Sequence, residues 1–157
     1  MATLFTYGLS EIQFNGTKVG MTYKDTARLT QEDPEITEHY EEGKANPAVT
    51  TETKRIPKLE FAIMNPDAQF LQTHMGGTYD SPTKTWSFDG SETVATGTWT
   101  VLPKKGFEHI KINKGQANAK IDFDISDKGL LLVRFVVTPL QPDDAEDKPI
   151  EIKEKIV

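Results

Sequence analysis

The stretch KLEFAIMNPDAQFLQTHMGG, residues 58–77, joins a strand pattern to a helix pattern, and its first part decides the fold class. In its first six residues the large apolar side chains of Leu59, Phe61 and Ile63 alternate with small or charged ones. This period of two predicts an antiparallel strand with one face in the core and the other toward solvent. Similar alternation recurs along the chain, so a mainly β fold is expected.

The second part of the same stretch carries the clearest helix signals in the chain. Asn65 suits the N-cap and Gly76 suits a left-handed C-cap, which predicts a short helix over about residues 66–75. Leu71 and Met75 lie four residues apart and therefore share a helix face. We expect this face to pack on the sheet.

Other segments repeat the strand pattern. In IDFDI the apolar Ile121, Phe123 and Ile125 alternate with Asp122 and Asp124, which predicts a half-buried strand. The segment LLLVRFVV is apolar on both faces except at its arginine, which indicates a central strand at residues 130–137. Further strands are expected at residues 9–14, 26–30, 85–88, 93–102 and 107–112. The predicted architecture is an antiparallel β-sandwich or small barrel with one short α-helix and a long polar loop.

Length, charge and cysteine content narrow the class of protein. A chain of 157 residues is most simply one domain. The absence of cysteine excludes disulfides and thiolate sites, and the formal net charge of -6 disfavours ordinary nucleic-acid binding. No run of about 18 apolar residues and no signal-peptide pattern is present, so we expect a soluble protein made in the cytoplasm without a membrane anchor.

Residues 31–55 interrupt the strand pattern with a long polar segment. Six acids lie from Glu32 to Glu42, and no Lys or Arg occurs in the segment before Lys44. A loop of about 25 residues is uncommon in a compact domain unless it is functional or disordered. Two interpretations follow: a mobile surface loop, or a segment that a partner chain orders. The alternation of EITEHY favours some extended structure there.

Motifs for catalysis and metal binding are weak. The three histidines, His39, His74 and His109, have unrelated flanking residues, and His74 lies where the end of the helix dipole favours a protonated ring. DFDISDKG resembles a calcium loop, but Asp127 stands where an EF-hand needs Gly and Val133 where it needs Glu. We expect no catalytic residue, no metal site, no cofactor and no enzyme activity.

An ordered set of segments resembles the phage major tail tube proteins. The segments are YGLSEIQFNGTKVG at residues 7–20, the polar segment at residues 31–55, the strand and helix at residues 58–77, and NAKIDFDISDKGLLLVRFVVTPLQPD at residues 118–143. Within them the shared features are the helix start at Asn65, Pro66 and Asp67, the double glycine at Gly76 and Gly77, and the exit at Thr138, Pro139, Leu140 and Pro142. Their order and spacing carry the resemblance.

The resemblance implies the β-sandwich or barrel of tail tubes and of the type VI secretion tube. It implies a structural, virion tail protein of a phage or prophage, made in the bacterial host cytoplasm, that assembles with itself into hexameric rings stacked as a tube. Other phage tail proteins are implied as partners, and DNA would pass through without specific binding. Within the chain it implies a tail-tube-like domain at residues 1–142.

The same resemblance marks the polar segment as the subunit interface. The candidate interface residues are Glu35, Ile36, Glu38, Tyr40, Glu41, Glu42, Lys44, Asn46, Val49, Lys54 and Arg55. Asp122 and Asp124 are candidates for an acidic face toward the lumen or solvent. Residues 143–157 do not map on the family pattern and read as an acidic linker followed by a possible edge strand or arm.

A second class of protein also fits the sequence. A non-enzymatic β-sandwich that binds a protein or glycan would need an exposed aromatic patch. Trp86, Trp99 and Tyr79 are the candidates for it. Both tryptophans alternate with Thr or Ser, which favours burial in the core over exposure. The hypothesis of a hydrolase is supported only by carboxylates that have no other assigned role.

Overall fold

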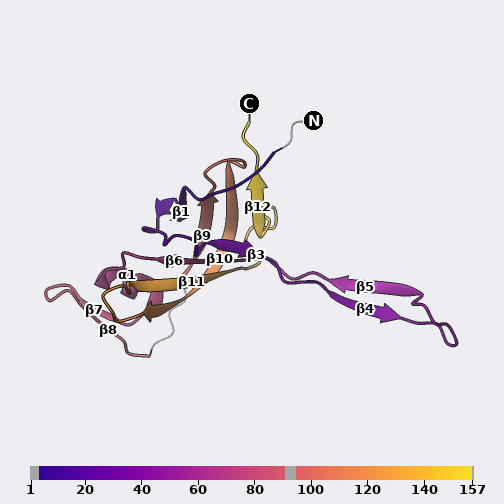
Figure 1. The fold of residues 1–157 in the computed structure, drawn as a ribbon, viewed down its shortest axis with the longest axis horizontal. Coiled ribbons are helices and arrows are strands. Elements are labelled where there is room, and N and C mark those ends of the chain that lie inside the picture. Colours follow the sequence, from indigo (N-terminus) through magenta and orange to yellow (C-terminus); the bar gives the residue numbers. More distant parts are fainter. Residues whose placement is uncertain (1–3, 91–94, 157) are drawn as a thin grey trace.

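A computed structural model describes residues 4–90 and 95–156 and shows a mainly β protein with antiparallel strands (Figure 1). The strands are β1 (Glu11–Phe14), β2 (Thr17–Lys18), β3 (Arg28–Thr30), β4 (Glu35–His39), β5 (Val49–Thr53), β6 (Lys58–Ile63), β7 (Thr78–Asp80), β8 (Thr85–Ser87), β9 (Ala95–Leu102), β10 (His109–Phe123), β11 (Leu131–Pro139) and β12 (Ile150–Lys153), and the helix is α1 (Ala68–Met75). The predicted fold class is confirmed, as an open, sandwich-like arrangement and not as a closed barrel.

The main sheet has eight strands in the order β2-β1-β9-β10-β11-β6-β3, with β12 also paired to β10. The long strand β10 organises it. One edge of β10 pairs with β9, while the other edge pairs first with β12, at His109 to Ile112, and then with β11, from Gly115 onward. The register shifts between Ile112 and Gly115. The sequence predicted separate strands at residues 107–112 and 121–125, and this was wrong because one continuous strand serves both halves of the sheet.

The core lies on the inner faces of these strands. β6 buries Leu59, Phe61 and Ile63, as the alternation predicted. Trp99 is fully buried, and its ring centroid lies 5.7 Å from that of Phe61. The predicted central strand is also confirmed, because β11 lies between β10 and β6.

The helix covers this aromatic core, but it begins later than the sequence predicted. Asp67 is the N-cap, and its Oδ1 accepts a hydrogen bond from the backbone N–H of Phe70 at 2.8 Å. Asn65 instead accepts from the backbone N–H of Met21 at 2.8 Å, which ties the helix entry to another segment. Gly76 ends the helix, as predicted, but its φ of 79° and ψ of -158° differ from the left-handed α conformation that was expected.

The end of the β10–β11 hairpin departs from its predicted burial. Ile121, Phe123 and Ile125 are exposed, Ile125 to 84%. The reason lies in strand length: β6 pairs with β11 only from Val133 onward, so the hairpin end extends beyond its neighbour. The alternating residues form a strand here, but the hairpin end extends beyond the rest of the sheet, and its apolar side chains stay exposed.

The C-terminal segment belongs to the main sheet. β12 pairs antiparallel with β10, Ile150 opposite Ile112 and Lys153 opposite His109. The linker before it is held by an ion pair between Lys114 Nζ and Asp143 Oδ1 at 2.9 Å. The edge-strand alternative for this segment is therefore the one that the structure forms.

Candidate assembly surface

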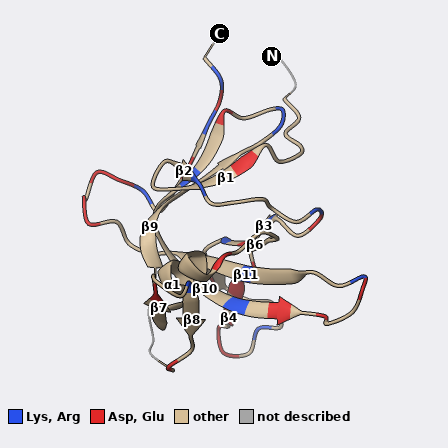
Figure 2. Ribbon diagram, turned by 90° about the vertical axis from the view of Figure 1, so that its left-hand side faces the viewer, with Lys and Arg blue, Asp and Glu red and all other residues tan. Residues whose placement is uncertain are grey.

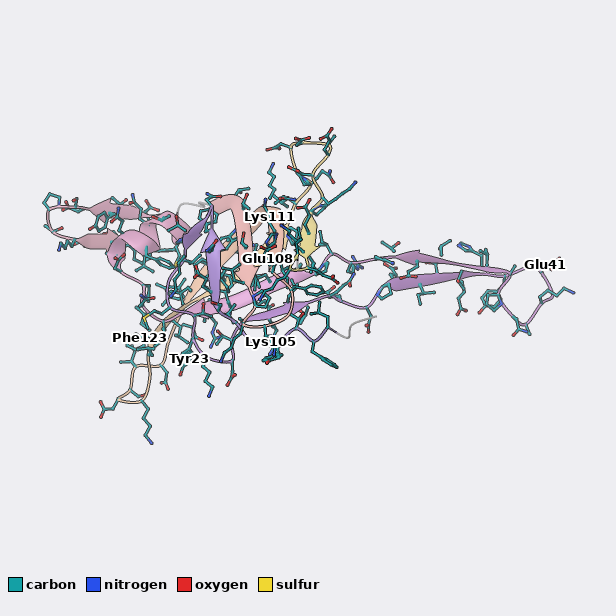
Figure 3. All side chains as sticks on the ribbon, turned by 90° about the horizontal axis from the view of Figure 1, so that it is seen from above. Tyr23, Glu41, Lys105, Glu108, Lys111 and Phe123 are labelled. Atoms are coloured by element: carbon teal, nitrogen blue, oxygen red, sulfur yellow. The ribbon has the colours of Figure 1, made fainter. Side chains whose placement is uncertain are left out.

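Residues 31–55, which we call the arm, form a β-hairpin that projects from the body of the molecule (Figure 1). β4 and β5 pair over five positions, from Glu35 opposite Thr53 to His39 opposite Val49. Glu41 lies at the far end of the arm in the view from above (Figure 3). The predicted long loop is thus a paired hairpin. Its first strand has the alternation seen in the sequence, and its second, VTTET, is rich in β-branched residues that favour strands.

Every residue of the arm is exposed. At its base Gln31 Nε2 donates to the carbonyl oxygen of Arg55 at 2.7 Å, and the Arg55 guanidinium lies 3.4 Å from a carboxylate oxygen of Glu35. At its tip the N–H of Ala48 donates to the carbonyl of His39 at 2.7 Å. Exposed ion pairs contribute about 0–1 kcal/mol, and an isolated two-stranded hairpin is marginally stable in water. The arm therefore lacks the packing that stabilises the rest of the chain.

The register of the hairpin sorts the side chains of the arm onto two faces, because directly opposite residues share a face. One face, which we call the acidic face, carries Ile36, Glu38, Tyr40, Thr50 and Glu52. The other, the threonine face, carries Glu35, Thr37, His39, Val49, Thr51 and Thr53.

The acidic face combines two apolar groups with two carboxylates. Ile36 is 61% exposed, and Tyr40 is also open to solvent. The Tyr40 hydroxyl donates a short hydrogen bond to Glu38, and this bond raises the pKa of the Tyr40 phenol above its ordinary value. Glu52 joins this face only through its pairing with Ile36, so sequence reasoning did not include it among the interface residues.

The other candidate interface residues lie at the two ends of the arm. Glu41, Glu42, Lys44 and Asn46 belong to the connection between β4 and β5 at the tip. Lys54 and Arg55 follow β5 at the base. The structure therefore brings the candidates together on one element but distributes them over its length and both faces.

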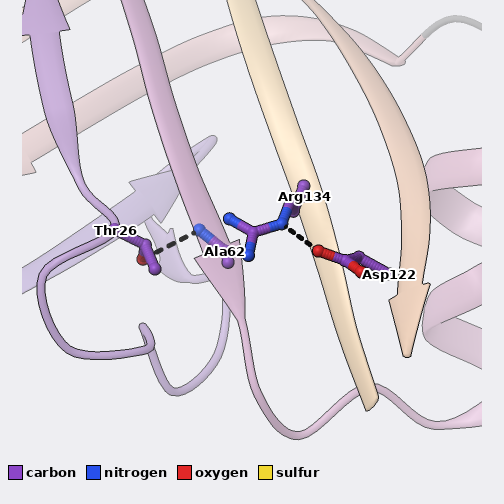
Figure 4. A network of polar contacts seen from close by, with 4 residues as sticks. All are labelled: Thr26, Ala62, Asp122 and Arg134. Atoms are coloured by element: carbon purple, nitrogen blue, oxygen red, sulfur yellow. Dashed lines mark hydrogen bonds and ion pairs between the residues drawn. The ribbon is translucent and has the colours of Figure 1, made fainter. Parts of the chain in front are cut away.

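The candidate acidic pair at Asp122 and Asp124 lies at the exposed end of β10. The carboxylate of Asp122 forms an ion pair with Arg134 on the neighbouring strand β11, whose Nε donates to Asp122 Oδ2 at 2.5 Å (Figure 4). In the same view Thr26 Oγ1 accepts from the N–H of Ala62 at 3.2 Å (Figure 4). Asp124 follows the strand and is exposed. Their assignment to a lumen stays a prediction.

The aromatic candidates for a binding patch separate in the structure. Trp99 is fully buried in the core. Trp86 is half-buried, and its indole N–H donates to the carbonyl of Gly76 at 2.8 Å. Tyr79 lies opposite Trp86 in the β7–β8 hairpin. With one of the three inside the core, they form no common exposed surface.

The histidines lie apart, and His74 differs from its predicted state. His39 is in the arm and His109 is on β10. His74 belongs to α1 and is 6% exposed, with its ring centroid 4.5 Å from that of Phe70 and 5.3 Å from that of Phe135. Burial lowers the pKa of His74, so the expected protonated ring at the helix end was wrong. Within residues 4–90 and 95–156 no three His, Asp or Glu side chains lie close enough to hold a metal ion.

Charged residues of both signs occur on the elements of the body seen in Figure 2. The only helix in the described part of the chain is too short to cross a membrane. A scan of the chain against protein-family models finds no match, and a search of curated proteins finds no similar sequence.

Proposed function

We propose that this chain is a phage tail tube subunit, which assembles with further copies of itself into stacked rings that enclose a conduit for DNA. The observation that carries the proposal is the fully exposed hairpin arm attached to a well-packed β body. A projecting two-stranded element is marginally stable alone, and packing against a neighbouring subunit supplies the missing burial. The order of sequence segments supports the family, and the number of six subunits in a ring rests on that resemblance.

The charge of the chain agrees with a conduit. DNA moves freely along a wall that offers few Lys or Arg contacts, because each such contact releases counterions and holds a phosphate. The formal net charge of -6 per subunit provides no general attraction for phosphate. Other tail proteins would contact the outside and the ends of the tube.

The test of this proposal removes the arm and leaves the body intact. Replacing residues 37–51 by Asn-Gly joins the paired residues Ile36 and Glu52 through a two-residue hairpin turn. The wild-type chain is expected to form rings or tubes in electron micrographs as its concentration rises. The shortened chain should stay monomeric in light scattering and should keep the cooperative urea unfolding of the body.

The matched control shortens the other small hairpin. Replacing residues 81–84 by Asn-Gly joins Asp80 to Thr85 at the end of β7 and β8 and should leave assembly unchanged. A wild-type chain that remains monomeric at high concentration, with no rings or tubes, would overturn the proposal and favour a monomeric binding module.

A further inference from the structure

A groove on the body combines the segment that immediately precedes the arm, residues 22–29, with residues from distant parts of the chain. It has a volume of about 610 Å³ and lies among β3, β9, β10 and the segments before β3. Its apolar lining includes Leu9, Leu29, Leu59, Val101 and Ile110. All except Leu59 are only half-buried, so the groove exposes part of the apolar surface that adjoins the core.

The charged lining of this groove is mainly basic. Lys24, Arg28 and Lys104 line it, with Asp25 as the single acid. None of the three cations forms an ion pair with another residue in the described part of the chain. The backbone N–H of Lys104 donates to the carbonyl of Gly8 at 3.4 Å, which joins the main chain at these two lining residues. We call this surface the basic groove.

The acidic face of the arm has the complementary chemistry. Ile36 and the Tyr40 ring can contact the apolar residues that line the groove, and the carboxylates of Glu38 and Glu52 can pair with its basic residues. The threonine face has one acid, Glu35, and that acid already lies beside Arg55. Charge and apolar content therefore distinguish the two faces as partners for the groove.

The arm does not reach the groove of its own chain. β3 ends at Thr30, and Ile36 lies six residues farther along the extended arm, a distance of about 20 Å at 3.3 Å per residue. The arm projects away from the body (Figure 1), and its tip at Glu41 lies farther still (Figure 3). The complementary surface must belong to another molecule.

We infer that the acidic face of the arm docks into the basic groove of a second copy of this chain. The inference rests on the proposed self-assembly and names the receiving surface. Arm and groove are different surfaces, so the contact is head-to-tail, and such contacts generate closed rings or open filaments. Each copy then gives one arm and receives one arm.

The test exchanges the charges of the two surfaces. The arm variant carries Glu38→Lys and Glu52→Lys, and the groove variant carries Arg28→Glu and Lys104→Glu; all four positions are exposed, so the core is untouched. Each variant alone should require a concentration at least about tenfold higher for assembly, because like charges meet at the contact. An equimolar mixture of the two variants should assemble as the wild type does, since every arm then meets a groove of opposite charge.

The control places two lysines on the opposite face of the arm. Thr37→Lys with Thr53→Lys occupies the same diagonal arrangement on the threonine face as positions 38 and 52 on the acidic face, and it should leave the assembly concentration unchanged. Light scattering over a dilution series and electron microscopy give the readout.

Each other result decides against the inference. If the wild type assembles and the variants assemble equally well, the groove is not the receptor. The same conclusion follows if the groove variant fails to rescue the arm variant. In both cases the proposed tube function still stands. If the threonine-face control weakens assembly as strongly as the arm variant, the contact is not specific to the acidic face, and the inference is wrong. A monomeric wild-type chain would overturn both the inference and the proposed function.

Discussion

Strand β6 and the arm have the same alternating pattern and opposite surroundings. In β6 every second side chain is large and apolar, and Leu59, Phe61 and Ile63 are buried in the core cluster, against which side chains of α1 also pack. In the arm Ile36 and Tyr40 share a face with Glu38 between them, and all the side chains of the arm are exposed. Alternation creates a two-faced strand, and only a covering layer turns one of those faces into a core.

This difference separates the stability of the subunit from its assembly. The body has a continuous cluster of buried apolar residues, whereas the arm contributes none to that cluster. We therefore expect substitutions in the body to change the free energy of unfolding and substitutions in the arm to change association. Four substitutions and a hydrogen-exchange measurement test this division.

The largest effect is expected from Trp99→Ala. Trp99 is fully buried, with ring centroids of Phe14 and Phe135 at 4.6 and 6.1 Å, so truncation leaves a large cavity. The free energy of unfolding should fall by about 3–5 kcal/mol in urea denaturation. Tyr40→Ala, an aromatic truncation in the arm, is the matched control. Equal losses for both variants would contradict the division between body and arm.

A smaller loss is expected from Gly115→Ala. A Cβ at this position would meet Trp99 Cδ1 and Val137 Cγ1, each at 2.7 Å, where β10 passes over the core. Overpacking of this kind costs about 1–3 kcal/mol in the free energy of unfolding. Asn118→Ala, at an exposed position of the same strand, should change it by less than about 0.5 kcal/mol. A neutral Gly115→Ala would show that the strand shifts freely there.

The pH dependence of stability should report on His74. Burial holds the pKa of its ring below the value in the unfolded chain, so the unfolded state takes up the proton first as pH falls. The stabilisation is complete above the unfolded pKa of about 6.5 and is lost as pH decreases from there toward the folded pKa, by up to about 1.4 kcal/mol per pH unit. His74→Phe should remove this part of the slope in denaturation curves at pH 5 to 7. An identical slope in both proteins would contradict a buried neutral ring.

The smallest effect on the dilute chain is expected from Ile36→Ala. Its side chain lies on the open acidic face, so the free energy of unfolding should change by less than about 0.5 kcal/mol. Ile12→Ala, the same truncation at a core position, should cost about 2–5 kcal/mol.

Hydrogen exchange completes this last comparison. In dilute solution the amides of the arm should exchange rapidly, and in assembled protein they should be protected. Strong protection of the arm in the dilute chain would mean that the hairpin is stable without a partner.

Much of the fold was predictable because it depends on local patterns. The period of two located β6, a run that is apolar on both faces located β11, and the glycine at position 76 marked the helix end. The helix start was missed because Asn65 and Asp67, which flank Pro66, are both good N-caps, and a distant backbone N–H at Met21 engages the first of them. Long-range competition of this kind leaves no local signal.

The candidate site was predictable as a segment but not as a surface. The acids and the few apolar residues of the arm are evident in sequence, whereas membership of Glu52 in the acidic face depends on its pairing with Ile36. The residues of the basic groove come from segments far apart in the chain, such as Lys24 and Lys104. The residues that line a groove follow no periodic pattern and no motif in the sequence, so the groove could not be predicted from it.

Local sequence patterns located most strands and the helix, because these follow from side-chain periodicity and capping within a few residues. Which of the alternating faces are covered depends on the tertiary structure. It joined two predicted strands into β10, left Ile121 and Phe123 beyond the end of β6, and left the arm without a neighbour. The physical reason is that burial depends on partners from distant parts of the chain, and on their length and register, while periodicity depends on a residue and its nearest neighbours.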